Sequence, residues 1–473
     1  MGENIMIIRE KETGSISHGE KNRIVQTFSR HINSGQVKYL KAGHLDVLET
    51  ERRSVRFVDP VSGKVMIDCF TSAGCFNVGR SNPVIIRAME EALETLDMGT
   101  STLISTHKVA LAERLAALGP GDLNNVLFAS GGGDAIDCAL KLARGSTGRS
   151  HIISTVKAYH GHTGFALSAN GKEHYRKYFE PLMPRFSFVP FNDLEAVRDA
   201  ITNDTAAIIV EPVQGEAGIF VAGNEYLRGL RRVCDEKNII LIFDEVQTGF
   251  GRTGKFFACE HSGVVPDILA MAKSIGGGMF PNGAVLYRDN GLLTGFVCHN
   301  PGFHPTYTGG SDLGCHISLR VIDYIMENNL LERASRNGKK LKEALEQLRR
   351  ENPKIIREVR GIGMMVGIEY IHEFLGPMMS DALAKNGVFA AYSGNAPQVM
   401  RFMLPIAAAD EDVDEVIGAI GKAVESMKTL LPIALPAAKI PGVLKLLNNE
   451  RVQTVVFNWI RSLEDFFSGV NRK

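Results

Sequence analysis

Charged side chains directly follow three short apolar runs in the middle of the chain. Asp244 follows the run at 239–243, Lys273 the run at 268–272, and Glu211 the run at 207–210. In an open parallel α/β sheet, ligands bind at the carboxyl ends of the strands. A lysine there can form a Schiff base with a carbonyl compound, and a carboxylate can hold a cationic ring nitrogen. Each of these residues, taken alone, could equally cap a loop without binding a ligand.

Three consecutive glycines, at 131–133, separate the apolar run at 125–129 from a helical segment that begins at Asp134. The backbone N–H groups of such a turn can approach an anion closely, and the helix N-terminus adds the positive end of its dipole. The pattern is neither the dinucleotide fingerprint nor the Walker loop. It predicts a phosphate cradle, although glycine turns before helices are also common without a ligand.

These features together suggest pyridoxal phosphate as the cofactor. Lys273 would bind its aldehyde, and Asp244 would keep its pyridine nitrogen protonated, so that the ring withdraws electrons. Tyr159, which follows another apolar run, would stack on the ring. His160 and His162 form an HxH pair, but no third metal ligand lies nearby in the sequence. We therefore expect no metal.

The composition and the N-terminal sequence argue against several classes of protein. The 473 residues include 53 Lys or Arg and 53 Asp or Glu, so the formal net charge is zero and we expect no nucleic-acid partner. The seven cysteines are widely spaced without a CxxC pair, which favours a reducing compartment. The N-terminus lacks a signal-peptide core, and no apolar run reaches the length of about 18 residues that a membrane span requires. The sequence predicts a cytoplasmic protein.

Short apolar runs recur between about 120 and 290, with helical or loop segments between most of them. They lie at 125–129, 151–156, 186–189, 206–210, 238–243, 267–271 and 283–287. Fully apolar runs, unlike alternating ones, are typical of strands buried on both faces. We expect one large α/β domain with a seven-stranded, mostly parallel sheet. Outside it, the patterns predict a hairpin over 53–70, helices over 83–97 and 312–350, and a smaller α/β lobe over 355–425.

Several motifs resemble those of the class III aminotransferases. The most specific is DEVQTGFGRTG at 244–254, followed by PDI at 266–268 and AKSIGGG at 272–278. The likeness continues in YHGHT at 159–163, EPVQGE at 211–216 and RFMLP at 401–405, and covers about 45–425. The family comprises fold-type I pyridoxal-phosphate enzymes, among them ornithine, acetylornithine and 4-aminobutyrate aminotransferases.

The resemblance implies specific roles in the cofactor site. Lys273 matches the lysine that forms the Schiff base and moves the proton. Asp244 matches the carboxylate on the pyridine nitrogen, and Gln247 matches the amide near the phenolic oxygen.

Further positions match residues around the ring and the phosphate. Tyr159 matches the stacking aromatic residue, and His160 belongs to the same cofactor-binding stretch. Gly132 and Gly133 match the phosphate-binding turn. Thr306 matches a threonine that reaches the phosphate from the neighbouring subunit, which implies a homodimer or a higher oligomer.

Two residues match the family's substrate-binding groups. Arg401 matches the arginine that binds the α-carboxylate of glutamate or 2-oxoglutarate. Glu211 is assigned to the carboxylate that pairs with this arginine when the other substrate is bound. The implied activity moves an amino group from an amine or amino acid to an oxo acid or aldehyde, with glutamate and 2-oxoglutarate as one pair.

The chain departs from the family in places that bear on the reaction. Where the family has Ser-Gly-Thr/Ser-Glu, this chain has Gly-Gly-Gly-Asp at 131–134, and a hydroxyl ligand to the phosphate is lost. Arg80 is an extra arginine that would either meet an anionic substrate or lie on the surface. A lyase, racemase or aminomutase on the same scaffold therefore stays open as the alternative to an aminotransferase. The third possibility is a catalytically silent binding protein.

The resemblance and the patterns together suggest four segments. Residues 1–70 form an N-terminal arm and part of the small domain, 71–325 the large cofactor-binding domain, and 326–429 the rest of the small domain. Residues 430–473 form a helical tail, whose start three prolines interrupt. The apolar positions of the tail predict a helix packed on the body or on a second subunit. A weak contact with a membrane or a partner is the alternative.

Overall fold

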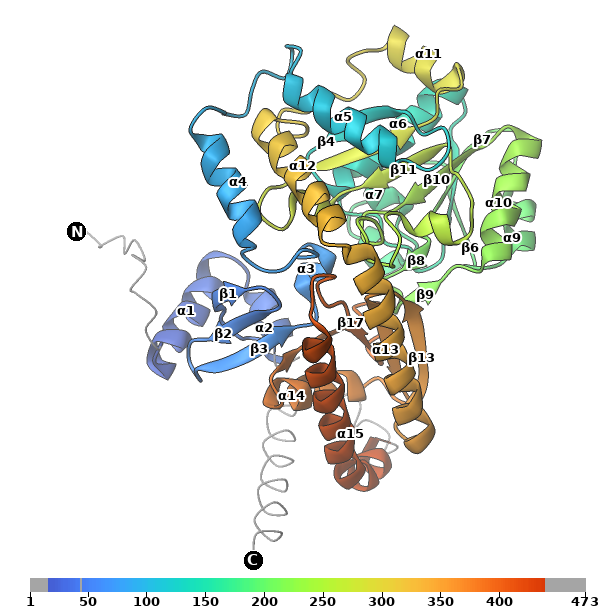
Figure 1. Ribbon diagram of the computed structural model, residues 1–473. Coiled ribbons are helices and arrows are strands. Elements are labelled where there is room, and N and C mark those ends of the chain that lie inside the picture. The colour runs from blue at the N-terminus through green and yellow to red at the C-terminus, as the bar shows by residue number, and fades with distance from the viewer. Residues whose placement is uncertain (1–15, 43–44, 439–473) are drawn as a thin grey trace, which may run out of the picture.

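The computed structural model describes residues 16–42 and 45–438 (Figure 1). The apolar positions that predict the helix of the 430–473 tail lie beyond residue 438, outside the described residues. In the part that is described, every helix is too short or too polar to cross a membrane.

The centre of the molecule is a seven-stranded sheet in the order β4-β12-β11-β10-β7-β5-β6 (Figure 1). Its strands are β4 (Asn125–Ala129), β5 (His151–Thr155), β6 (Phe186–Val189), β7 (Thr205–Val210), β10 (Ile240–Asp244), β11 (Ile268–Met271) and β12 (Gly283–Tyr287). All neighbouring pairs are parallel except those of β12, which is antiparallel to β11 and to β4. The predicted seven-stranded, mostly parallel sheet is confirmed.

Each central strand divides its apolar side chains between two cores. In β7, Ile208 and Val210 belong to one buried cluster, while Ala207 and Ile209 belong to the other. Successive side chains of a strand point to opposite faces, so a strand covered on both faces must be apolar at every position. Helix α6 (Gly132–Thr147) supplies much of the second cluster through residues such as Ile136 and Leu140.

Two smaller sheets lie below the large one in Figure 1. The first contains β1 (Thr50–Arg53), β2 (Arg56–Asp59), β3 (Lys64–Asp68) and β15 (Val388–Phe389). The antiparallel pair of β2 and β3 confirms the predicted hairpin, and β15 pairs in parallel with β3. The first sheet therefore joins segments from both ends of the chain. The second contains β13 (Ile356–Ile362), β14 (Met365–Tyr370), β16 (Ala391–Tyr392) and β17 (Val399–Phe402).

The helical stretch predicted over 312–350 is divided into α12 (Asp312–Glu327) and α13 (Leu330–Glu351). Asn329 has φ of +50°, a left-handed conformation that ends the regular helical path and that asparagine tolerates better than most residues. The hydroxyl of Ser311 accepts a hydrogen bond from the backbone N–H of Gly314 and caps the start of α12.

Helix α15 (Asp410–Ala438) passes the predicted start of the tail without a break. It continues through positions 432 and 436, so the expectation that these two prolines interrupt the helix is wrong; Pro441 lies outside the described residues. A proline removes one backbone hydrogen bond of a helix, and the neighbouring turns of α15 remain helical.

The other helices are short or lie on the outside of the sheets. They are α1 (His18–His31), α2 (Ser34–Ala42), α3 (Thr71–Gly74), α4 (Pro83–Leu93), α5 (Thr106–Leu118), α7 (Gly164–Ala169), α8 (Glu173–Arg176), α9 (Leu194–Ala200), α10 (Asn224–Lys237), α11 (Leu292–His299) and α14 (Leu375–Lys385). The predicted helix over 83–97 corresponds to α4. A short antiparallel pair, β8 (Val213–Gln214) and β9 (Phe220–Val221), follows β7.

Candidate active site

A cavity of about 170 Å³ opens where the carboxyl ends of the central strands meet the start of α6. Its lining brings together most of the site residues that the sequence predicts. The lining residues are Gly132, Gly133, Tyr159, His160, Gly161, Glu211, Val213, Glu216, Asp244, Val246, Gln247 and Lys273. Thr306 and Arg401 are not among them.

Lys273 lies two residues beyond the end of β11 and starts a 3-10 turn, Lys273–Gly276. Its φ of +48° falls in the left-handed region, where a side chain with a Cβ is strained. The turn is fastened to helix α3, because the hydroxyl of Ser274 donates a hydrogen bond of 2.9 Å to the carbonyl oxygen of Gly74. The strained turn places the lysine at the cavity.

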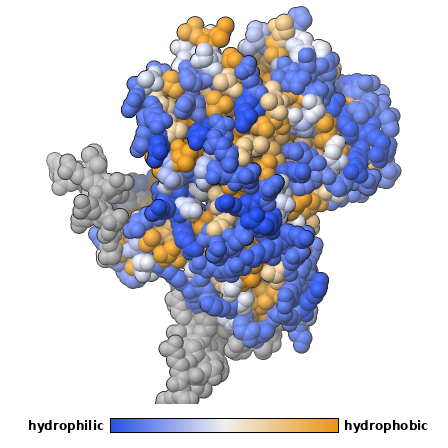
Figure 2. Space-filling view, in the orientation of Figure 1, coloured by the Kyte–Doolittle hydropathy of each residue, from blue (hydrophilic) through white to orange (hydrophobic). Residues whose placement is uncertain are grey.

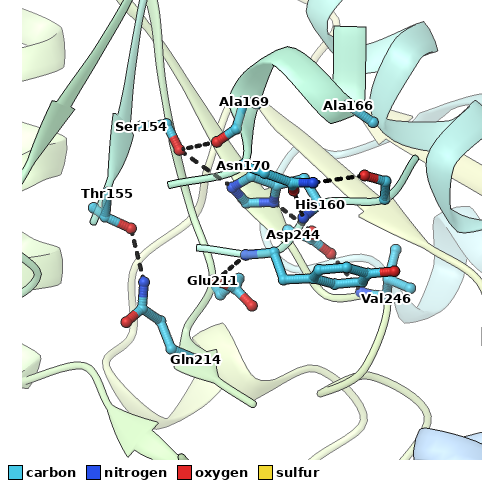
Figure 3. Close-up of polar contacts among 12 residues, drawn as sticks. Ser154, Thr155, His160, Ala166, Ala169, Asn170, Glu211, Gln214, Asp244 and Val246 are labelled. Carbon is cyan, nitrogen blue, oxygen red and sulfur yellow. Dashed lines mark hydrogen bonds and ion pairs between the residues drawn. The ribbon is translucent and has the colours of Figure 1, made fainter. Parts of the chain in front are cut away.

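Asp244, the last residue of β10, is held by two donors (Figure 3). Nδ1 of His160 donates to its Oδ2 over 2.7 Å, and the backbone N–H of Val246 donates to its Oδ1 over 3.0 Å. Nε2 of His160 lies 3.5 Å from the hydroxyl of Ser154, which itself donates to the carbonyl oxygen of Ala169. The predicted cofactor-site histidine thus contacts the predicted ring-nitrogen carboxylate. The described residues contain no group of three metal ligands.

The cavity has an aromatic wall and an aliphatic wall. Tyr159 packs edge-on against Tyr175 and His162, with ring centroids 5.4 and 5.5 Å apart. Burial raises the pKa of the Tyr159 phenol, so this side chain presents a neutral ring. Val246 also lines the cavity and supplies its aliphatic part. A planar ring is the kind of group that such walls accept.

The glycines at the start of α6 lie close to their neighbours. A Cβ on Gly133 would come within 2.8 Å of Oγ1 of Thr163, and one on Gly132 within 3.0 Å of Val246. Glycine therefore keeps the backbone N–H groups of the helix start accessible at the cavity. These N–H groups and the helix dipole fit a phosphate, as the sequence predicts.

Thr306 lies beside this helix start. Its hydroxyl is 2.7 Å from the hydroxyl of Ser130 in the same chain. The same loop is fixed by His304, whose Nε2 lies 3.0 Å from Oδ1 of Asp134 and which lowers the pKa of that carboxyl. The predicted contact of Thr306 with a neighbouring subunit stays a prediction.

Gln247 joins the cavity to the N-terminal part of the chain. Its Nε2 donates a hydrogen bond of 2.9 Å to the carbonyl oxygen of Ala73. Its side chain also packs against Gly215, where a Cβ would collide with the amide oxygen. The amide is therefore fixed at the cavity edge.

The expected pairing of Arg401 with Glu211 is wrong. Arg401, which lies on β17, forms a short ion pair with Glu216, and both side chains are largely buried. Glu211 lies at the end of β7 and accepts a hydrogen bond of 3.3 Å from the backbone N–H of Tyr159. Burial first, and then the charge of Asp244, raise the pKa of Glu211 well above its ordinary value.

The spacing of the motif explains this error. Glu211 and Glu216 both belong to EPVQGE, and the motif alone does not distinguish which of them meets the arginine. The β8–β9 hairpin begins just after Glu211 and carries Glu216 away from the strand end. Although burial opposes the ionisation of Glu216, the charge and hydrogen bond of Arg401 keep its pKa below the ordinary value.

Arg80 is a structural residue. It is buried, and its Nη1 donates to Oδ2 of Asp68 over 2.6 Å. Its guanidinium also lies 4.3 Å from the ring centroid of Phe76. The expectation that Arg80 lies on the surface is therefore wrong.

The chain is similar to one family of known proteins. The model of the family "Aminotransferase class-III" matches residues 40–424. An "Uncharacterized aminotransferase" of Archaeoglobus fulgidus is 40% identical over 405 residues, which cover 86% of this chain and 94% of the relative.

Solved structures of aminotransferases are also similar to this chain. The ornithine aminotransferase of Toxoplasma gondii is 26% identical with a TM-score of 0.79, covering 86% of this chain and 96% of its own. A second structure of that enzyme notes partial occupancy of PLP at its active site. An (S)-enantioselective omega-transaminase from Thermomicrobium roseum is 27% identical with a TM-score of 0.77, covering 85% of this chain and 98% of its own.

All of these neighbours are named for transamination, and none supports the lyase, racemase or aminomutase alternative. The fold, the cavity and the family match therefore lead to one assignment. The chain belongs to the class III aminotransferases, fold-type I enzymes that use pyridoxal phosphate to move an amino group between small amine and oxo-acid substrates.

Proposed function

We propose that Lys273 and Asp244 are the catalytic residues of this aminotransferase. Bound pyridoxal phosphate supplies the electron sink for the reaction. Lys273 would hold the aldehyde carbon of the cofactor, and its amine would carry a proton to and from the substrate carbon. Asp244, oriented by His160, would keep the ring nitrogen protonated. Their common place in the cavity lining supports these roles.

Other residues position the cofactor in this proposal. When the cofactor is bound, Tyr159 would stack on its ring, and the fixed amide of Gln247 would face its phenolic oxygen. Gly132 and Gly133 would bind the phosphate through their backbone N–H groups. Thr306 would complete the phosphate site of a second subunit.

The proposal for the substrates is that glutamate and 2-oxoglutarate form one of the two pairs. Its main support is the ion pair between Arg401 and Glu216 beside the cavity. An arginine can grip a carboxylate with two parallel hydrogen bonds. A buried arginine without a partner is costly, so Glu216 satisfies Arg401 when the substrate lacks a carboxylate at this place. When the carboxylate of glutamate or 2-oxoglutarate enters, it replaces Glu216.

The test is to measure the two half-reactions separately. Arg401→Lys loses the two-pronged contact, so we expect the 2-oxoglutarate half-reaction to lose roughly 1.5–3 kcal/mol of stabilisation. The half-reaction of a primary amine without a carboxylate should change much less. Glu216→Gln should show the reverse pattern, because it leaves Arg401 poorly paired only when no substrate carboxylate is present.

A matched control is Arg357→Lys, because Arg357 also pairs with a glutamate, Glu369, over 3.0 Å but outside the cavity. It should leave both half-reactions unchanged. Equal losses in both half-reactions of Arg401→Lys, or no reaction with any dicarboxylate, would refute the proposed pair.

A homodimer is part of the same proposal. Large apolar side chains are exposed near the start of α5 and on the loop of Thr306, namely Leu103, Ile104, Val109 and Tyr307. Figure 2 shows apolar residues at the tip of the loop that joins α4 to α5. A second copy would cover such residues. A cytoplasmic location is proposed on the seven free cysteines, which suit a reducing compartment.

A further inference from the structure

The turn between β16 and β17 lies against the ion pair of Arg401 and Glu216. Ala391 of β16 is opposite Arg401 of β17 in the antiparallel register. The hydroxyl of Ser393, in the turn, donates a short hydrogen bond to the backbone carbonyl oxygen of Glu216. The turn, the arginine and its carboxylate partner therefore form one connected unit.

Asn395 lies in this turn and is held from two directions. The hydroxyl of Tyr175, in α8, donates to its Oδ1 over 2.9 Å. Nζ of Lys172 lies 3.3 Å from its backbone carbonyl oxygen. Tyr175 itself packs on Tyr159, the residue placed beside the cofactor ring. Burial and the charge of Glu216 raise the pKa of Tyr175, so its hydroxyl remains a donor.

The hydrogen bond from Tyr175 leaves the amide nitrogen of Asn395 as an unused donor. Among the described residues, Nδ2 of Asn395 is buried without an acceptor, and so is Nε of Arg401. Buried donors are rarely unsatisfied, and each one requires an explanation. A carboxylate is an acceptor with about four lone-pair sites and can serve several donors at once.

We propose that Asn395 is a specificity-determining residue that donates Nδ2 to the substrate carboxylate bound by Arg401, and that Tyr175 is the residue that positions it. The inference rests on the proposed role of Arg401. In this proposal, Asn395 adds a neutral donor from the turn to the charged donor from β17, Arg401. The carboxylate site is thereby coupled, through Tyr175 and Tyr159, to the cofactor ring.

The experiment uses the holoenzyme and glutarate, which has both carboxylates of 2-oxoglutarate but lacks its reactive ketone. Its dissociation constant is measured by calorimetry for Asn395→Ala, Asn395→Asp and Tyr175→Phe. We expect Asn395→Ala to weaken glutarate binding roughly tenfold, as for loss of a hydrogen bond to a charged group. Asn395→Asp should weaken it further, because a second negative charge would face the carboxylate. Tyr175→Phe keeps the ring and should weaken it several-fold.

The half-reactions provide the second readout. The Asn395 variants should raise the KM for 2-oxoglutarate and leave the half-reaction of a primary amine without a carboxylate close to the wild-type rate. Asn328→Ala and Tyr178→Phe serve as matched controls, because Asn328 follows α12 at an exposed helix end and Tyr178 is exposed. Both controls should bind glutarate like the wild type. If Asn395→Ala does not fold, Asn395→Asp and Tyr175→Phe decide the question.

The outcomes separate this inference from the proposed substrates. Unchanged glutarate binding in the Asn395 variants overturns the inference, even if Arg401→Lys abolishes the 2-oxoglutarate half-reaction. Equal losses in both half-reactions also overturn it, because they indicate a structural role for Asn395. If wild-type enzyme neither binds glutarate nor uses 2-oxoglutarate, the proposed substrate pair itself is wrong and the inference falls with it.

Discussion

Nδ1 of His160 lies 2.7 Å from Oδ2 of Asp244, and neither side chain is more than 6% exposed. The backbone N–H of Val246 occupies the other carboxylate oxygen. Each oxygen retains a lone pair, so Asp244 can accept a further hydrogen bond from the cavity. The histidine fixes the direction in which this carboxylate meets a cationic ring nitrogen.

We expect Asp244→Asn to lower the rate of both half-reactions roughly 10³-fold or more, several kcal/mol of barrier. An amide cannot keep the ring nitrogen protonated, so the carbanion charge is not delocalised. Single-turnover rates measure the effect. His160→Ala should cause a smaller loss, because it frees the carboxylate without removing it. A loss under tenfold in Asp244→Asn would mean that Asp244 does not contact the ring nitrogen.

Lys273→Ala should abolish turnover while the protein still folds. The lysine lies in a turn after the strand, and its side chain is not part of the apolar core. Borohydride reduction of the wild-type holoenzyme, followed by peptide mapping, should locate the cofactor on this residue. Labelling of a different lysine, or retained turnover in the variant, would exclude the assignment.

Glu211 gives a prediction about stability and pH. Its pKa is raised in the folded state, so the folded protein binds its proton more tightly than the unfolded chain does. Its contribution to stability is full below the unfolded pKa of about 4.3 and is lost as the pH rises through the folded pKa. Glu211→Gln stays neutral at every pH. Chemical unfolding should therefore show that, as the pH rises from the unfolded to the folded pKa, the variant gains stability relative to the wild type. The gain in the free energy of unfolding should be up to about 1.4 kcal/mol per pH unit.

If the difference in the free energy of unfolding between wild type and Glu211→Gln does not change with pH, the pKa of Glu211 is not raised in the folded protein. Glu225→Gln is a suitable control, since the Glu225 carboxylate pairs with Arg228 on the exposed surface.

Assembly is predicted from the exposed apolar loop. Ile104 is 96% exposed in the single chain. If a second copy covers it, Ile104→Glu would bury a charge and weaken the dimer. Sedimentation velocity of the wild type should show a dimer at assay concentration, and the variant should dissociate and lose activity in parallel. A fully active wild-type monomer would refute the shared site.

The local signals in the sequence are sufficient to predict the large sheet and several of the residues around its cavity. Strands buried on both faces must be apolar along their whole length, so β7 and β10 are visible as apolar runs. The residue that follows such a run must lie at the strand end, and this alone places Asp244 and Lys273 at the carboxyl edge of the sheet. The motif around Asp244 then resembles that of the class III aminotransferases, and the family match over residues 40–424 confirms this resemblance.

Only the tertiary structure decided which carboxylate meets Arg401. Glu211 and Glu216 are five positions apart in one motif, and both are far from Arg401 in sequence. The path of the β8–β9 hairpin brings the second of them to β17, and the first remains at the strand end beneath Tyr159. The contact of Tyr175 with Asn395 joins segments 220 positions apart. Such pairings depend on how distant elements pack, and no periodicity or spacing within either segment encodes them.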